Sequence, residues 1–324
     1  MSVTPTELVR IYRSGFHEGS HYGSVVITDP DGTVLHSRGD ARAPVFPRSS
    51  AKPFQSIAML ESGADLTGAD LALASASHSG EPMHVERALA ILGRAGLTED
   101  DLGCPTALPL NDAAKLAVLE AGGEPRRIYM NCSGKHSGML TACVGKSWST
   151  GDYLSTDHPL QVQVADVVTR LTGEAPSAVG IDGCGAPLFA VPLVALAVGF
   201  GRVNAASLGT PERQVADAMR AHPEMVGGTG REDTRLMQSF PGLLVKGGAE
   251  GVHCAALPDG RCVAVKITDG GDRARMPVLI GALRWLGVVP ETPAASALLD
   301  ELGVGVVLGG GAPVGATEVA PQVF

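Results

Sequence analysis

The stretch Phe46-Pro47-Arg48-Ser49-Ser50-Ala51-Lys52-Pro53-Phe54 decides the fold that we expect, because it marks where a helix begins. Proline lacks a backbone N–H and its ring clashes with the carbonyl four residues earlier, so Pro53 fits only in a first helical turn. Apolar residues then recur at spacings of three and four up to Leu60, as on a helix with one face on a core. The sequence therefore predicts a helix that begins near Ser49, with Ser49 and Lys52 on one face.

A Ser-x-x-Lys pair at a helix start is a candidate for nucleophilic catalysis. A serine hydroxyl becomes a nucleophile when a neighbouring base takes its proton, and a lysine can be that base only if burial or a second cation lowers its pKa. The pair therefore needs a second basic residue from elsewhere in the chain. The same residues also fit a helix cap followed by a solvated lysine, and the other motifs have to decide between the two.

Length and composition indicate a soluble protein with a small-molecule partner. The 324 residues are 44% apolar, which is enough for a large core, and the net charge of -9 argues against a nucleic-acid-binding surface. Residues 1–16 lack the apolar core of a secretory signal, and the longest apolar stretch, 191–200, is too short to span a bilayer. We therefore expect a cytoplasmic protein that binds neither membrane nor nucleic acid, with its six cysteines reduced and mostly buried.

Strands are predicted at both ends of the chain and helices in the middle. An Asp-Gly turn at Asp31-Gly32 joins a hairpin, and a meander of three short apolar runs comes late in the chain, so the strands are expected at 24–28, 33–36, 243–246, 251–256 and 262–267. Helices are expected at 82–93, 112–121, 134–145, 158–172, 187–200, 211–220 and 273–286. The Gly-rich tail is weakly patterned, and Gly309-Gly310-Gly311 is interpreted as a turn.

This pattern predicts an α+β layered fold. One antiparallel sheet is built from the N-terminal hairpin and the C-terminal meander, with a helical region inserted between them. We expect a single catalytic domain over residues 1–324, with the sheet part at about 1–50 and 240–290 and the helical part at about 50–240.

Five motifs in this order carry a resemblance to a known family. They are Arg48-Ser49-Ser50-Ala51-Lys52-Pro53, Ser77-His78-Ser79-Gly80-Glu81, Asn131-Cys132-Ser133-Gly134-Lys135-His136, Asp182-Gly183-Cys184-Gly185 and Lys246-Gly247-Gly248-Ala249-Glu250-Gly251. Over nearly its whole length, the chain resembles the rhizobial-type, thermolabile (asparaginase II-like) L-asparaginase family. That family shares the architecture of serine β-lactamases and penicillin-binding proteins, so the resemblance implies this architecture here.

The resemblance also implies functional residues. It pairs Ser49 with Lys52 and Ser79 with Lys246, it puts Asp182 close to the substrate, and it implies a zinc-binding group of Cys132, Lys135 and Cys184. The residues alone favour a role as small buried side chains for the two cysteines over zinc binding, and a lysine has to lose its proton before it can bind zinc. A homodimer is expected.

The predicted reaction is the hydrolysis of L-asparagine to L-aspartate and ammonia through an acyl-enzyme. Ser49, deprotonated by Lys52, would attack the side-chain amide carbon, while a charged Lys246 helps to keep Lys52 neutral. Ser79 could pass the proton to the departing amine.

A free amino acid also needs a cation and an anion in its pocket. Arg48 and Asp182 fit these roles, although Arg48 equally fits a surface ion pair and Asp182, between glycines, a turn. The roles of Glu18 and His21 stay open.

Two other functions fit the same motifs. Glutamine, a β-lactam or a D-amino-acid amide could be the substrate, although the absence of a Ser-Asp-Asn motif argues against a β-lactam. A non-catalytic amino-acid-binding protein is the third alternative, and the presence of both Ser–Lys pairs argues against it.

Overall fold

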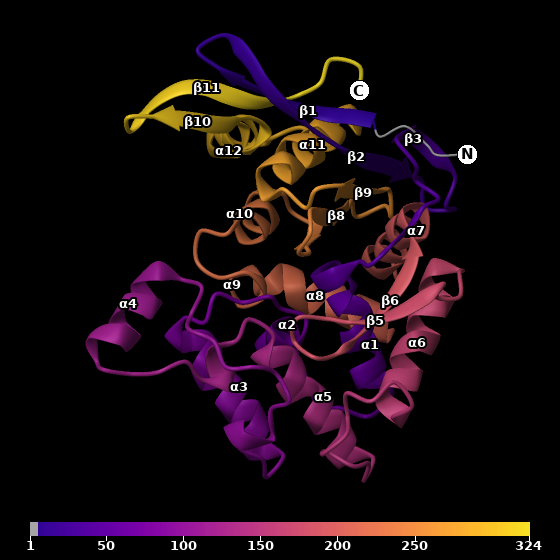
Figure 1. Ribbon diagram of the computed structural model, residues 1–324. Helices are drawn as coiled ribbons and strands as arrows, with labels where there is room; N and C mark the ends of the chain where they lie inside the picture. The colour runs from indigo at the N-terminus through magenta and orange to yellow at the C-terminus, as the bar shows by residue number, and fades with distance from the viewer. Residues whose placement is uncertain (1–5) are drawn as a thin grey trace. The chain divides into compact units, whose positions relative to one another are not determined.

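The computed structural model describes residues 6–324, which fall into two compact units. The first unit takes the chain up to Ser50, Val191–Ala205 and Ser239–Phe324, and the second takes Ala51–Ala190 and Ala206–Gln238. Strands dominate the first unit and helices the second (Figure 1). Residues 1–5, part of the stretch considered for a secretory signal, lie outside the described residues. A single catalytic domain stays a prediction.

An eight-stranded antiparallel sheet forms the first unit. Its strand order is β10-β11-β1-β2-β9-β8-β7, and β3 also pairs with β2. The strands are β1 (Thr6–Arg13), β2 (Phe16–Thr28), β3 (Val34–Arg38), β7 (Leu244–Gly247), β8 (Val252–Ala256), β9 (Cys262–Ile267), β10 (Gly305–Gly309) and β11 (Ala312–Val319). The predicted N-terminal hairpin is β2–β3 and the predicted meander is β7–β8–β9, so the structure confirms the α+β layered fold.

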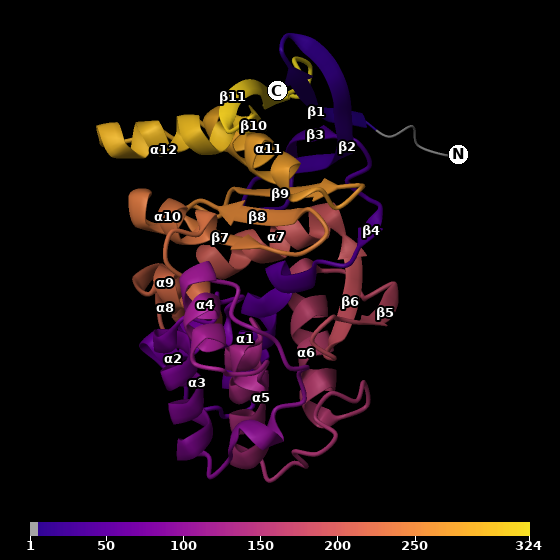
Figure 2. The same cartoon turned by 60° about the vertical axis from the view of Figure 1, so that its left-hand side comes forward.

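Helices cover both faces of this sheet. Helix α7 (Leu193–Asn204) and helix α11 (Asp272–Trp285) both contact β2, β8 and β9, and Figure 2 shows them on opposite faces. Every residue of β7 and β8 is buried, which explains why these strands read as short continuous apolar runs. At the end of α7, Asn204 donates from Nδ2 to the carbonyls of Gly242, Ala256 and Leu257 at 2.8–3.0 Å.

The C-terminal tail completes the sheet, which the sequence analysis did not predict. After helix α12 (Pro293–Gly303), β10 and β11 form a hairpin, and β11 pairs with β1 in a register that sets Val319 opposite Val9. Gly310 and Gly311 adopt positive φ angles in the turn that was expected there.

The second unit is a helical assembly around α1. Helix α1 packs against α5, α6 and α8, and α5 also contacts α2 and α3. Its helices are α1 (Lys52–Glu61), α2 (Gly68–Ala74), α3 (Pro82–Arg94), α4 (Asp112–Glu120), α5 (Ser133–Gly145), α6 (Pro159–Thr172), α8 (Pro211–Ala221), α9 (Pro223–Val226) and α10 (Glu232–Ser239). No helix in the described part of the chain combines the length and apolar character needed to cross a bilayer.

Two helix predictions need correction. The predicted helix at 187–200 is the strand β6 (Pro187–Pro192) followed by α7, because a buried strand and a buried helix share one apolar pattern and Pro192 divides them. Residues 187–190 of β6 pair with β5 (Ala178–Ile181), and the last two residues of β6 pair with β4 (Pro44–Val45). The helix predicted near Ser49 begins at Lys52, after the 3₁₀ turn η1 (Arg48–Ala51), and Pro53 lies in its first turn.

Candidate active site

Ser49 lies half-buried in the 3₁₀ turn η1, and this turn lies against the strand that carries Lys246. The hydroxyl of Ser50 donates to the carbonyl of Lys246 at 2.9 Å. Gly248 permits this approach, because a Cβ atom there would lie 2.7 Å from the carbonyl oxygen of Pro47. The first unit thereby brings the segment of Ser49 and the strand of Lys246 together.

Both basic residues of that neighbourhood are held in unusual settings. Lys246 is 1% exposed and donates from Nζ to the carbonyl of Gly247 at 2.8 Å. Arg48 has a φ of 51°, in the left-handed region that non-glycine residues rarely adopt. Its guanidinium lies 3.7 Å from the Glu250 carboxylate, which is an exposed ion pair and contributes little to stability.

Lys52 is the first residue of α1 and has a serine partner within the second unit. Its side chain is 1% exposed, and Nζ donates to the carbonyl of Ala76 and, at 2.9 Å, to the hydroxyl of Ser77. Ser77 stands in the same motif as Ser79 but carries no predicted role from the sequence. Lys52 therefore contacts the first serine of that motif.

Ser79 has a different partner. Its hydroxyl donates at 2.7 Å to Oε1 of Glu81, which also accepts from the backbone N–H of Thr229 at 2.8 Å. The Thr229 hydroxyl donates to the other carboxylate oxygen at 2.6 Å. Gly228, with a φ of 116°, permits this packing, because a Cβ atom there would lie 1.7 Å from the Ser79 hydroxyl oxygen. Ser79 belongs to the second unit and Lys246 to the first.

His78 fixes the backbone between the two serines. Its Nδ1 accepts from the N–H of Gly80 at 3.1 Å, so Nε2 carries the proton and donates to the hydroxyl of Ser133 at 2.9 Å. The ring stacks on His84 with centroids 5.0 Å apart. Burial, followed by the electrostatic influence of His84 and Lys52, holds the pKa of His78 well below its usual value, so the ring is neutral near pH 7.

Cys132, Lys135 and Cys184 form a buried cluster in the second unit. Lys135 Nζ lies 3.0 Å from the sulfur of Cys184, which lies 3.6 Å from Oδ2 of Asp182. A hydrogen bond from Cys184 and the charges of Lys52 and Lys135 lower the pKa of the Cys132 thiol well below its usual value, against the effect of burial. The cluster therefore carries a thiolate beside the buried ammonium group of Lys135.

The two sulfurs and the Lys135 nitrogen are donor types that bind zinc, provided that the lysine loses its proton. Burial lowers the pKa of Lys135, but the charges of Cys184 and Cys132 outweigh burial and raise it, so a metal would have to displace this proton. Within residues 6–324, no three or more His, Cys, Asp or Glu side chains are grouped so as to hold a metal ion.

Other candidate residues have local partners. Oδ1 of Asp182 accepts from the N–H of Gly183 at 2.9 Å, as in the turn that was the alternative role for this aspartate. Glu18 pairs with Arg13 at 2.8 Å. His21 donates from Nδ1 to Asp269 at 2.7 Å, and its Nε2 accepts from an arginine, so both of these residues of β2 have structural contacts.

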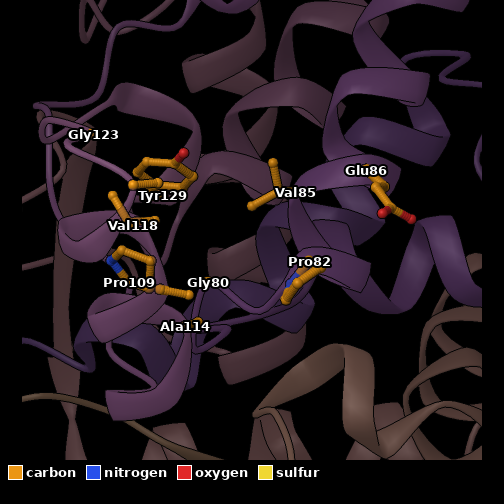
Figure 3. A pocket seen from close by; sticks show the side chains of 11 residues that line it. Gly80, Pro82, Val85, Glu86, Pro109, Ala114, Val118, Gly123 and Tyr129 are labelled. Carbon is orange, nitrogen blue, oxygen red and sulfur yellow. The ribbon is translucent and has the colours of Figure 1, made fainter.

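A hollow of about 380 Å³ lies beside Gly80 in the second unit (Figure 3). Its walls are mostly apolar and come from α3, α4 and the 3₁₀ turn η3 (Arg127–Tyr129), with Val85, Val118 and Tyr129 among them. Helix α4 has no fully buried side chain. Glu86 is the charged residue among those that line the hollow, so this space offers room for an apolar group and no nucleophile.

Comparison with known proteins gives one family. The model of the family described as L-asparaginase II matches residues 9–319. A search of curated proteins finds no match. Among solved structures, similar chains include a putative β-lactamase from Bacteroides dorei (15% identity, 77% of this chain and 85% of that one, TM-score 0.42). Another is Mglu in its native form, with 14% identity over 84% of this chain and 65% of that one and a TM-score of 0.46. A third is a β-lactamase from Mycobacterium bovis, with 15% identity over 87% of this chain and 95% of that one and a TM-score of 0.40.

Proposed function

Because the chain belongs to the L-asparaginase II family, we propose that it hydrolyses L-asparagine to L-aspartate and ammonia. Membership makes it an asparaginase-like amidohydrolase, and the choice of asparagine and the mechanism are our proposal. The observation that carries the mechanism is the hydrogen bond from Ser50 to the Lys246 carbonyl. It supports a nucleophile at Ser49, because it holds the serine's segment against a strand with a buried lysine.

The proposed reaction begins with attack by Ser49 on the side-chain amide carbon of asparagine. The hydroxyl proton passes to Lys52, which follows Ser49 by three residues along the chain, and the oxyanion is held by backbone N–H groups. Ammonia leaves after its nitrogen has taken up a proton, and water then hydrolyses the ester to aspartate.

We assign the proton relay to Ser77 in place of Ser79. Lys52 donates to the Ser77 hydroxyl, so a proton that Lys52 receives has a neighbouring oxygen through which it can pass. The Ser79 proton is already directed at Glu81. The variants Ser77→Ala and Ser79→Ala distinguish the relay residue from a binding residue. Loss of the relay lowers kcat by 10²-fold or more, whereas loss of a binding group raises KM.

Arg48 is the proposed partner of the substrate carboxylate, and Asp182 stays a candidate for the ammonium. No step in this scheme uses a metal. Zinc at Cys132, Lys135 and Cys184 stays a prediction, which metal analysis of the purified protein would test. A cytoplasmic homodimer also stays a prediction.

The test of the proposed function is Ser49→Ala with an ammonia assay. Activity on asparagine should fall by roughly 10⁴-fold or more, with an unchanged melting temperature to show that the variant is folded. Hydroxylamine added to the wild-type reaction should yield aspartyl hydroxamate, because it competes with water for the acyl-enzyme. An active Ser49→Ala enzyme would refute the assignment.

Assays of the wild-type protein with other substrates test the alternative functions. Faster ammonia release from glutamine than from asparagine would identify a glutaminase, and turnover of a chromogenic β-lactam would identify a β-lactam hydrolase. Calorimetric binding of asparagine without ammonia release would identify a non-catalytic binding protein.

A further inference from the structure

Arg275 lies in the first turn of α11 and is almost completely buried, with 8% of its surface exposed. A guanidinium has five N–H donors and no acceptor. Nη1 donates to the carbonyl of Gly248 at 3.3 Å, and Nε is buried without a hydrogen-bond partner in the described chain. A buried donor without a partner destabilises a protein, because it has lost its bonds to water.

The charge of Arg275 has only an exposed partner among the described residues. Its ion pair joins Nε to Oδ1 of Asp272 at 3.5 Å, three residues earlier on the same helix. The Asp272 side chain is 74% exposed, and a carboxylate in water balances a neighbouring charge only weakly. A buried guanidinium is best held by a bidentate carboxylate, which bonds two of its N–H groups at once. Arg275 therefore retains the capacity to bind an anion.

Two glycines bring this arginine close to the turn that carries the proposed nucleophile. A Cβ atom on Gly247 would lie 2.8 Å from Nη1 of Arg275, so the guanidinium packs directly on the backbone at the end of β7. A Cβ atom on Gly248 would lie 3.1 Å from the hydroxyl oxygen of Ser50, the neighbour of Ser49. All of these residues belong to the first unit. Arg275 and the η1 turn therefore contact the same short backbone segment.

We propose that Arg275 receives the α-carboxylate of the amino-acid substrate, as a second cation beside Arg48. This inference rests on the proposed function. A carboxylate brings one negative charge and two acceptor oxygens in a plane, which match the charge and the unsatisfied donor of the buried guanidinium. Arg275 is then a specificity-determining residue, which favours amino-acid amides over amides without a carboxylate.

The experiment measures asparagine hydrolysis by the wild type and by Arg275→Met, which keeps an apolar stem and removes the charge. KM should rise roughly 10- to 100-fold, as expected when a hydrogen bond to a charged group is lost. The value of kcat should stay within about threefold of wild type, because the carboxylate is bound alike in the ground and transition states. The inhibition constant of L-aspartate, which carries the same carboxylate, should rise by the same factor as KM.

The matched control is Arg284→Met. Arg284 lies in the last turn of the same helix and forms an exposed ion pair with Asp300, so its replacement should change neither KM nor the inhibition constant.

Two outcomes would overturn the inference. One is an unchanged KM in Arg275→Met, and the other is a lower kcat and melting temperature without a change in KM or in the inhibition constant, which is the signature of a structural role. If Arg275→Met does not fold, Arg275→Lys keeps the charge but loses the planar fork, and its KM should still rise several-fold. A wild-type KM in the lysine variant would then decide against the inference. Failure of the wild-type enzyme to release ammonia from asparagine would instead refute the proposed function.

Discussion

Replacing Gly228 by alanine should damage the candidate site and the stability of the second unit together. The φ of 116° lies outside the regions that alanine adopts readily, which costs on the order of 1–3 kcal/mol. The added methyl carbon would also lie 1.7 Å from Ser79 Oγ and 2.6 Å from Glu81 Oε1. Ser79 would have to move by more than about 1 Å, which breaks its bond to Glu81 and adds about 1–3 kcal/mol of overpacking.

The assay is thermal unfolding of Gly228→Ala beside Gly230→Ala. Gly230 has a φ of 74°, and no heavy atom lies within 4 Å of the position that an added methyl group would take, so alanine there adds backbone strain alone, about 1 kcal/mol. We expect Gly228→Ala to melt roughly 5–15 °C below wild type and Gly230→Ala only about 2–4 °C below. Adding Ser79→Gly to Gly228→Ala should recover part of the loss. Equal melting temperatures for the two alanine variants would refute the close packing of Gly228 on Ser79.

Two further predictions concern stability. Burial, followed by the electrostatic influence of His84 and Lys52, depresses the pKa of His78. The neutral ring's contribution to the free energy of unfolding is therefore complete above pH ~6.5 and is lost as the pH falls toward the depressed value. Urea unfolding should give a smaller free energy at pH 5 than at pH 7. His78→Gln should flatten this dependence, and an identical slope would contradict the assignment. Asn204→Ala should cost about 2–3 kcal/mol in the same assay, since two buried carbonyls and one partly buried carbonyl lose their donor, whereas exposed Ser207→Ala should cost less than about 0.5 kcal/mol.

The elements with a strong local pattern were predictable from sequence. The hairpin has its Asp-Gly turn at Asp31-Gly32, and the meander has three apolar runs with turns between them, so both were located, although β2 begins at Phe16 and not at residue 24. The run at 187–200 was not resolvable by pattern, because burial on every side removes the periodicity that separates strand from helix. Strands β10 and β11 were missed because most of their residues are at least partly exposed and glycine or alanine recurs in both, so they carry neither a clear alternation of apolar residues nor a strong strand propensity.

The candidate site was predictable as a set of motifs but not as a set of partners. Ser77 and Ser79 are two residues apart and belong to one motif, so composition and spacing give no reason to pair Lys52 with one of them. Nothing in the sequence pairs Glu81 of the same motif with Thr229, because Thr229 comes from a distant loop. Hydrogen-bond partners across such distances depend on tertiary packing, which a single sequence does not encode in any local pattern.

The pairing of β1 with β11 imposes an order on folding during synthesis. Strand β1 acquires β2 as soon as the first hairpin leaves the ribosome, but its other edge waits for the strand at the opposite end of the chain. The segment Ala51–Ala190 of the second unit is made long before that strand, so its helices can assemble while the sheet is still open. Until β11 arrives, β1 presents an unpaired edge to other nascent chains, and a chain that stops before Ala312 would keep that edge permanently.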